Sequence, residues 1–229
     1  MKQISIGIAV TAVAMVALSV PASAGAATMT TLALWNMNEA PGSHTLVDSS
    51  GHGINGTIGT EVVLNGAVHT FAYLKPNTPP AHPQHIDMVN SSLLNPGTRD
   101  YSITIRAKWT NAFGNILQKG QAGAVGGYFK FQAPKGLVQC LFRGSLGNAG
   151  VSSKRALNDG LWHVITCTRT ATQVSMTVDG VVTNTLKHAT GAVSNNVPLT
   201  IAGKSNCDQV KITCDYFAGQ IDYVRIQTS

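Results

Sequence analysis

Tyr101-Ser-Ile-Thr-Ile-Arg-Ala-Lys-Trp109 is the clearest strand pattern in the chain. Every odd-numbered residue of this stretch is apolar, and every even-numbered residue is polar or charged. Successive side chains of a β-strand point to opposite faces of the sheet, so a period of two predicts a strand with one buried face and one face in water. The stretch therefore predicts a half-buried strand in a layered β protein.

The same pattern recurs along the chain. Gln173–Val178 alternates in the same way, Asp179-Gly180 follows, and Val181–Leu186 is again rich in β-branched residues. Asp-Gly between two such runs is typical of a hairpin with a tight primed turn. Further strands are expected at Thr31–Trp35, Gly114–Gln118, Tyr128–Gln132, Leu137–Phe142, Leu161–Arg169, Leu199–Ala202 and Phe217–Ile226. About a dozen short strands at this spacing, without a long helix, predict an all-β protein that is a two-sheet sandwich or a jelly roll.

The first 24 residues have the order of a secretory signal peptide. A charged start at Lys2 precedes an uncharged run from Ile4 to Val20, and the small residues Ala22-Ser23-Ala24 follow. This order predicts export with cleavage after residue 24. An uncleaved membrane anchor is the alternative, but a spanning helix usually needs about 20 strongly apolar residues. We expect residues 25–229 to form a single domain, with no membrane span after cleavage.

Charge is sparse in this chain. Only 11% of residues are charged, and the formal net charge is +6. The basic residues are scattered, whereas a nucleic-acid-binding face gathers them into a patch or stripe. We therefore expect no nucleic-acid partner. The mild basic excess would favour acidic glycans or an anionic envelope over other surfaces.

Four cysteines lie after the predicted signal peptide. An even number in an exported chain predicts two disulfides, and three pairings are possible. Cys207 and Cys214 are close in sequence, which favours a bridge across a short loop and leaves Cys140 to pair with Cys167. A zinc site is the rival interpretation, but no Cys-x-x-Cys pair supports it.

Leu34–Glu39 is followed by the loop Asp48-Ser-Ser-Gly-His-Gly-Ile-Asn-Gly-Thr57. These two stretches are similar to the opening strand and the Asp-Ser-Ser-Gly-x-x-x-Asn-Gly loop of laminin-G-like domains of the concanavalin A-like lectin/glucanase superfamily. Asn158–Val164 resembles its Asp-Gly-x-Trp-His strand, and Val178–Gly180 the Val-Asp-Gly hairpin after it. Gly219–Ile226 resembles the closing strand. The segments occur in the family's order and span nearly the whole mature chain.

The resemblance implies an all-β, two-sheet antiparallel jelly-roll β-sandwich of the concanavalin A-like type, with Trp35, Trp109 and Trp162 as aromatic anchors of the core. The sequence around Cys140 and Cys167 is similar to secreted actinobacterial members in which these two strands are bridged. It implies a secreted, extracellular or cell-envelope protein. A sugar-stacking platform needs an exposed ring, and the candidates near loops are Phe113 and Tyr128.

The superfamily includes glucanases, so catalytic groups need separate consideration. Glycoside hydrolysis normally needs two carboxylates that flank the scissile bond. The only glutamates, Glu39 and Glu61, have no carboxylate two to five residues away. Polysaccharide lyases of similar fold use a Tyr-x-Lys element, which Tyr128 and Lys130 match superficially, but the Arg-rich strand offers Arg106 alone. We expect no catalytic residues and no enzyme activity.

Calcium is the cofactor that the resemblance favours, because many related jelly rolls bind it. The ion takes 6–8 oxygen ligands from carboxylates and carbonyls. Pairing of the first and last strands would bring Asn38, Asp48 and Asp222 towards one locus. The alternative is that Asp48 caps a turn and Asp222 makes local hydrogen bonds.

The expected function is that of a secreted non-catalytic binding module that recognises carbohydrate or the cell-envelope surface. A structural or protein–protein interaction domain at the cell surface is the first alternative, with a surface protein as partner. A polysaccharide-active enzyme of the lyase type is the second. The assignment of function rests on resemblance of fold, which by itself does not identify a ligand.

Overall fold

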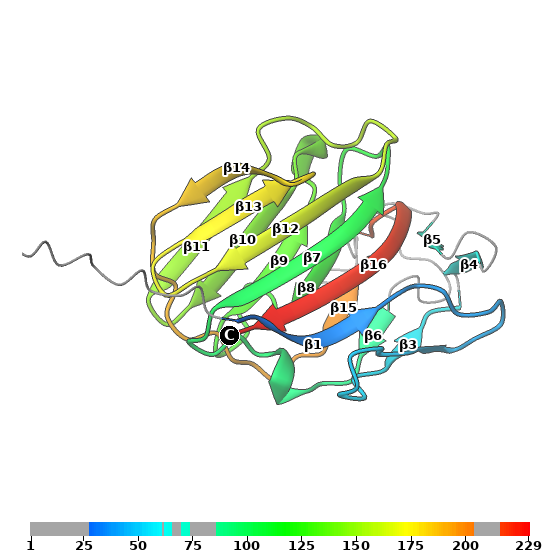
Figure 1. Cartoon of the computed structure of the whole chain (residues 1–229), viewed down its shortest axis with the longest axis horizontal. Helices are drawn as coiled ribbons and strands as arrows, with labels where there is room; N and C mark the ends of the chain where they lie inside the picture. The colour runs from blue at the N-terminus through cyan, green and yellow to red at the C-terminus, as the bar shows by residue number, and fades with distance from the viewer. Residues whose placement is uncertain (1–27, 61, 66–69, 74–85, 204–215) are drawn as a thin grey trace, which may run out of the picture.

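The computed structural model describes residues 28–60, 62–65, 70–73, 86–203 and 216–229. These residues form two antiparallel sheets packed face to face (Figure 1). The strands are β1 Thr30–Trp35, β2 Thr45–Leu46, β3 Gly56–Ile58, β4 Val63–Asn65, β5 Thr70–Tyr73, β6 Ile86–Met88, β7 Tyr101–Lys108, β8 Asn115–Lys119, β9 Tyr128–Gln132, β10 Gln139–Gly144, β11 Gly147–Ser152, β12 His163–Arg169, β13 Val174–Val178, β14 Val181–Leu186, β15 Leu199–Ile201 and β16 Gly219–Thr228. Two single 3-10 turns, η1 Ser92–Leu94 and η2 Pro134–Gly136, are the helical elements of this part of the chain.

The front sheet is built around the strand with the clearest alternation. Its strand order is β14-β13-β12-β7-β16-β5-β4, and β1 pairs with β16. Strand β7 lies between β12 and β16, with His163 opposite Ala107 and Ile226 opposite Ile103. The predicted hairpin between β13 and β14 is confirmed, since Asp179 and Gly180 both have positive φ as a primed turn requires.

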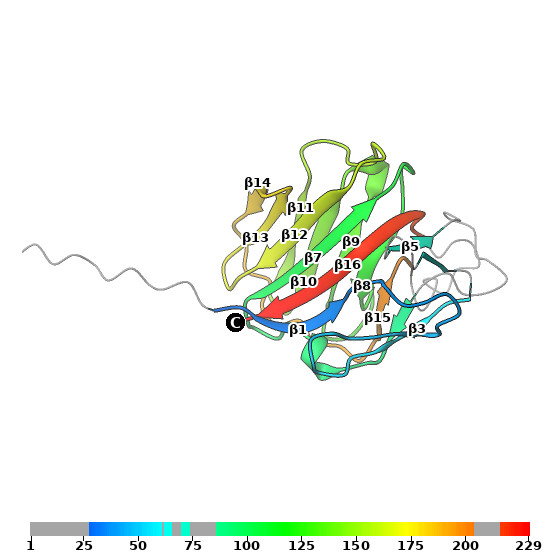
Figure 2. The same cartoon turned by 45° about the vertical axis from the view of Figure 1, so that its right-hand side comes forward.

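The back sheet has the strand order β11-β10-β9-β8-β15-β6-β3-β2. Its central strands come from consecutive hairpins, while β15 joins them to the strands of the N-terminal third. Figure 2 shows this layer behind the front sheet after a 45° turn. The two-sheet antiparallel sandwich that the sequence predicts is thereby confirmed.

One buried cluster fills the space between the sheets, because each strand turns its apolar side chains inward. Tyr101 packs against Phe129 and Phe142, with ring centroids 5.5 and 6.4 Å apart. A disulfide between Cys140 of β10 and Cys167 of β12 joins the back sheet to the front sheet, as predicted. The predicted partners Cys207 and Cys214, like the signal peptide of residues 1–24, lie outside the described residues.

Two of the three tryptophans are core anchors, and one is not. Trp35 is fully buried and donates from Nε1 to the carbonyl of Ile54 at 2.8 Å, and Trp109 is 3% exposed. The prediction for Trp162 is wrong. Strand β12 turns His163 inward, so alternation places Trp162 on the outer face, partly exposed. Its ring faces the side chains of Arg106 and Lys108, 4.5 and 5.1 Å from the ring centroid.

Within the ranges given above, no helix is long and apolar enough to cross a bilayer.

Candidate functional site

A groove of ≈500 Å³ opens at one end of the sandwich. Three segments bound it: the loop 120–127 between β8 and β9, the hairpin 143–148 between β10 and β11, and the segment 187–198 that leads into β15. The lining residues are Gly123, Ala124, Gly126, Gly127, Arg143, Gly144, Ser145, Ala192 and Ser194. A second hollow of ≈460 Å³ shares Ala124 and Ser194 with the groove and extends it along Asn195 and Asn196.

The walls of the groove meet backbone against backbone. Gly126 and Gly127 have φ of 87° and 85°, which favour glycine. A Cβ at Gly126 would overlap the carbonyl oxygen of Ser194, and one at Gly127 would overlap that of Arg143. The amide of Ser194 donates to the carbonyl of Gly126 at 2.8 Å. The three segments are therefore held at a spacing that only glycine permits.

Buried Arg169 fixes one end of the segment 187–198. This inward-facing residue at the end of β12 is 1% exposed. Its guanidinium donates to Thr190 Oγ1 at 2.9 Å and to the carbonyl of Gly191, and also to the carbonyls of Gly97 and Arg99, both at 3.0 Å. Burial lowers the pKa of Arg169, against the opposing effect of a nearby aspartate. One buried cation thus ties two loops to the core.

Buried Lys119 fixes the other end of the same segment. Its Nζ donates to the carbonyls of Asn195 and Val197 at 3.2 and 2.7 Å, and to Asn90 Oδ1 at 3.1 Å. Burial lowers the pKa of Lys119 to about 8. The side chain of Asn195 adds a bond from Nδ2 to the carbonyl of Gly127 at 2.9 Å, which ties the segment to the glycine-rich loop. The groove is therefore pre-formed.

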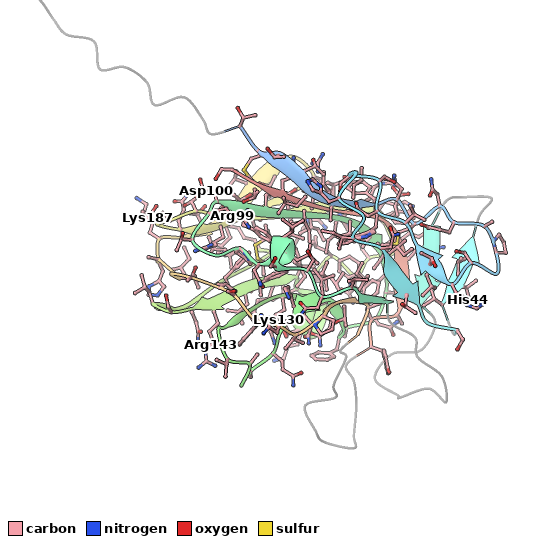
Figure 3. All side chains as sticks on the ribbon, turned by 90° about the horizontal axis from the view of Figure 1, so that it is seen from below. His44, Arg99, Asp100, Lys130, Arg143 and Lys187 are labelled. Atoms are coloured by element: carbon pink, nitrogen blue, oxygen red, sulfur yellow. A yellow bond between two sulfur atoms is a disulfide. The ribbon has the colours of Figure 1, made fainter. Side chains whose placement is uncertain are left out.

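The groove has no negative side chain. Residues 120–127, 143–148 and 187–198 contain no aspartate or glutamate, whereas Arg143, Lys187 and His188 add basic groups. Figure 3 shows Arg143, Lys130 and Lys187 on the same half of the molecule, away from His44. The exposed polar side chains that line the groove are Arg143, Ser145 and Ser194. This arrangement offers hydrogen-bond donors and positive charge to a ligand.

The two predicted stacking residues do not line the groove. Tyr128 follows Gly127 directly but is only 7% exposed, so the expectation of an exposed ring there is wrong. The ammonium of Lys130 lies 6.0 Å from the centroid of the Tyr128 ring. Phe113 is partly exposed, but it precedes β8, whose far end leads into the groove. Phe113 therefore lies at the opposite end of the sandwich.

The residues predicted to bind calcium are engaged with the protein. Asp48 Oδ1 accepts from the amides of Leu34 and Ser50 at 3.0 and 2.9 Å, and Oδ2 accepts from Ser50 Oγ and the amide of Ile54. Burial opposes ionisation of Asp48, but these hydrogen bonds outweigh it and hold the pKa of its carboxyl below the usual value.

Asp222 pairs with Arg106 at 2.6 Å, and Asn38 is exposed. Among the residues that the structure describes, no three His, Cys, Asp or Glu side chains cluster as metal ligands. As placed, Asn38, Asp48 and Asp222 do not fit the oxygen-rich shell that calcium needs. Asp48 instead caps its turn, the alternative that the sequence left open, so these three residues as placed do not support the prediction of calcium binding.

The family-like Asp-Gly-x-Trp-His and Val-Asp-Gly segments meet in a structural cluster. His163 is 3% exposed, with Nδ1 2.8 Å from Asp179 Oδ2 and Nε2 3.1 Å from Asp159 Oδ1. Hydrogen bonds from the amide of Leu161 and from His163 hold the pKa of Asp159 below its usual value. Burial raises the pKa of Asp179, but hydrogen bonds from His163 and the amide of Val164 outweigh it and keep that pKa low as well. Both ring nitrogens of His163 face a carboxylate, so His163 joins two turns.

Sequence reasoning did not identify Arg143, Ser194, Lys119 or Arg169 as site residues. One signal was present in the glycine spacing of Gly120-Gln-Ala-Gly-Ala-Val-Gly-Gly127, since clustered glycines mark close backbone approach. Another was the inward position of Arg169 in a period-two strand. Neither signal names the partner segments, which lie far away in the sequence.

Comparison with known proteins gives the family. The laminin-G family model for the concanavalin A-like lectin/glucanases superfamily matches residues 81–229. The fold is similar to the binding domain of Paraclostridial Mosquitocidal Protein 1 (13% identity, TM-score 0.60, 87% of this chain and 48% of that one). It is also similar to the binding domain of Botulinum Neurotoxin DC, solved in complex with SialylT (12% identity, TM-score 0.59, 87% and 46%).

The chain spans about half the length of these two solved structures. A search of curated proteins found no match. At these identities the structural likeness shows the fold, while the family model covers well over half of the chain. The chain therefore belongs to the concanavalin A-like lectin/glucanases superfamily, as a laminin-G-like domain.

Proposed function

We propose that this chain is an exported, non-catalytic module that binds carbohydrate in the groove. The observation that carries the proposal is the groove itself, held open by buried Arg169 and Lys119 and lined mostly by small residues, with Arg143, Ser145 and Ser194 as its polar side chains. Ligand sites are concave, mostly pre-formed and fitted with a few placed polar groups. A volume of ≈500 Å³ lies in the range of small-molecule sites.

The chemistry of the lining favours binding over catalysis. Glycoside hydrolysis needs two carboxylates on either side of the bond, and the groove segments contain none. A lyase would need Tyr128 as an accessible base, but its ring is buried. Both observations support a binding module and weaken the enzymatic alternative.

The structural neighbours agree with this proposal without specifying a ligand. Both are binding domains, and one was solved in complex with SialylT. Because their identity to this chain is 13% or less, the likeness extends to the fold, and the proposed ligand class rests on the groove.

Export completes the proposal. The predicted signal peptide and the disulfide between Cys140 and Cys167 both fit an oxidising, extracellular or envelope location. The glycan would then be one that is presented outside the cytoplasm.

A protein partner is the second candidate, and a specific surface favours it. Val181 and Val182 on edge strand β14 are 66% and 64% exposed. An edge strand presents unpaired backbone N–H and C=O groups that can pair with another chain, and the exposed valines can pack against that chain. Such a partner would bind at β14 and would not depend on the groove.

A glycan array with a groove-filling variant tests the proposal. Ser194 is exposed in the lining, so Ser194→Trp should fill the groove and abolish glycan binding. Ala156→Trp is the matched control, because Ala156 is exposed in the loop after β11, at the opposite end of the sandwich. Equal binding by both variants, or no binding by the unmodified protein to any glycan, would refute the groove as a carbohydrate site.

A further inference from the structure

Arg143 stands out among the groove residues because its charge has no partner among the residues that the structure describes. We propose that Arg143 is the specificity-determining residue of the groove, and that it selects carbohydrates bearing a carboxylate, sulfate or phosphate group. This inference rests on the proposed carbohydrate function and narrows it to acidic glycans.

The strand pattern places the Arg143 side chain on the outer surface. Phe142 and Cys140 of β10 are fully buried in the core, so alternation turns Arg143 away from it. The backbone there is fixed, since Arg143 pairs with Tyr128 on one side and Asn148 on the other. The guanidinium therefore extends from a rigid strand end into the groove lining.

Arg143 differs from the other arginines with defined contacts. Arg106 pairs with Asp222, Arg155 with Asp159, and Arg169 with loop oxygens. In the part of the chain that the structure describes, the guanidinium of Arg143 has no hydrogen bond or ion pair with the protein. Because no carboxylate occurs in the three groove segments, none is at hand to neutralise it.

Ser194 supplies a second donor on the facing wall. Its hydroxyl is exposed and, over the same ranges, makes no hydrogen bond to the protein. Gly126 lies against the carbonyl of Ser194, and its neighbour Gly127 lies against that of Arg143. Two adjacent glycines thus hold the two walls in register. A charged fork and a hydroxyl on facing walls suit a group with several acceptor oxygens.

The chemistry of guanidinium narrows the ligand further. Its planar fork matches carboxylate, sulfate and phosphate oxygens with two parallel hydrogen bonds, which are stronger than bonds between neutral groups. A neutral sugar would leave that capacity unused. Carboxylate, sulfate and phosphate groups share a cluster of anionic oxygens. The experiment below distinguishes the three groups, because it uses a separate polymer for each.

Matched polymers that differ only in charge test the proposal. The probes are polygalacturonate against its methyl ester, dextran sulfate against dextran, and a poly(glycerol phosphate) chain against polyglycerol. The unmodified protein should bind at least one charged member about 10- to 100-fold more tightly than its neutral partner, as expected for two charge-assisted bonds. Arg143→Gln should abolish that preference, and Arg143→Lys should keep part of it.

Lys154→Gln is the control for net charge. Lys154 is exposed in the loop after β11, at the far end of the sandwich, and its replacement removes the same charge. Equal weakening by Lys154→Gln and Arg143→Gln would show that only overall charge matters, and would overturn the inference. Circular dichroism and thermal melting verify that both variants fold.

Two other outcomes distinguish the role of Arg143 from carbohydrate binding itself. Equal affinity for charged and neutral partners, or a charge preference that survives in Arg143→Gln, overturns the role of Arg143 and leaves carbohydrate binding standing. Absence of binding to every glycan, charged or neutral, overturns the proposed function itself.

Discussion

Replacing Arg169 with methionine should have two effects: it should destabilise the protein, and it should disorder one wall of the groove. The guanidinium is 1% exposed and donates to four oxygens, three of which are backbone carbonyls. Methionine fills part of the same space but donates nothing. Each buried acceptor left without its partner typically costs about 1–3 kcal/mol, so the loss of four such bonds should cost at least about 3 kcal/mol. We expect a loss of about that size in the free energy of unfolding.

Urea denaturation of the disulfide-intact protein measures this loss, and hydrogen exchange measures its location. Faster exchange should be confined to the loop that contains Gly97 and to the amides between Thr190 and Asn195. The free energy of unfolding of Arg169→Lys should lie between those of the unmodified protein and Arg169→Met, since an ammonium offers three donors without the planar fork. Arg155→Met is the control: Arg155 is a surface residue, and its change should stay within about 0.5 kcal/mol.

A loss below about 1 kcal/mol with unchanged exchange would refute the reasoning, because an ordinary mutation already costs that much. The groove wall would then be held by Lys119 and the glycine contacts alone. A large loss with normal exchange in the groove segment would refute the local part only. Glycan affinity, measured in parallel, should be lower in Arg169→Met, because one wall of the groove is disordered in that variant.

Four further predictions follow from the same contacts. Asp48→Asn should lower the free energy of unfolding by about 3 kcal/mol, because it weakens hydrogen bonds to a charged acceptor. The pKa of Asp48 is lowered in the folded state, so the wild type should lose this advantage as the pH falls below 3.8. Measuring unfolding as a function of acid pH checks this. Replacing Cys140 and Cys167 together by alanine should cost about 3–4 kcal/mol in urea denaturation, for a sequence separation of 27. Between pH 8 and 10.5 the unfolded chain holds more protons at Lys119 than the folded one, so stability should rise across that window in wild type and less in Lys119→Gln. Calcium should leave the melting temperature unchanged, because the carboxylate of Asp48 is already engaged; a rise that EDTA reverses would contradict this.

The sequence was sufficient for the architecture because local alternation carries it. The pattern over Tyr101–Trp109 fixed which side chains of β7 face the core, and the Asp179-Gly180 turn fixed the register of one hairpin. Both features depend on neighbours in sequence, where side-chain period and turn chemistry are readable. The prediction that Trp162 anchors the core was wrong because it relied on the size of the ring, whereas the alternation of β12 places that position on the outer face.

The groove could not be predicted in the same way, because its parts meet only in three dimensions. Arg169 contacts Gly97, which lies 72 residues before it in the sequence, and Gly191, which lies 22 residues after it. No local pattern names such partners. Asp48 shows the converse: its loop motif was recognisable, but whether its oxygens face a metal or the backbone depends on how the loop folds onto β1.

The glycine contacts divide the groove into positions that can change and positions that cannot. Gly126 and Gly127 admit no side chain, and Ser145 Oγ accepts from the amide of Ala192 at 3.0 Å, whereas Ser194 is exposed and could carry many side chains without disturbing the walls. Randomising Ala124, Arg143 and Ser194 would alter the recognition surface while the frame beneath stays the same. The domain is thus a natural scaffold for a combinatorial library, in which new ligand preferences can be selected at little risk to folding.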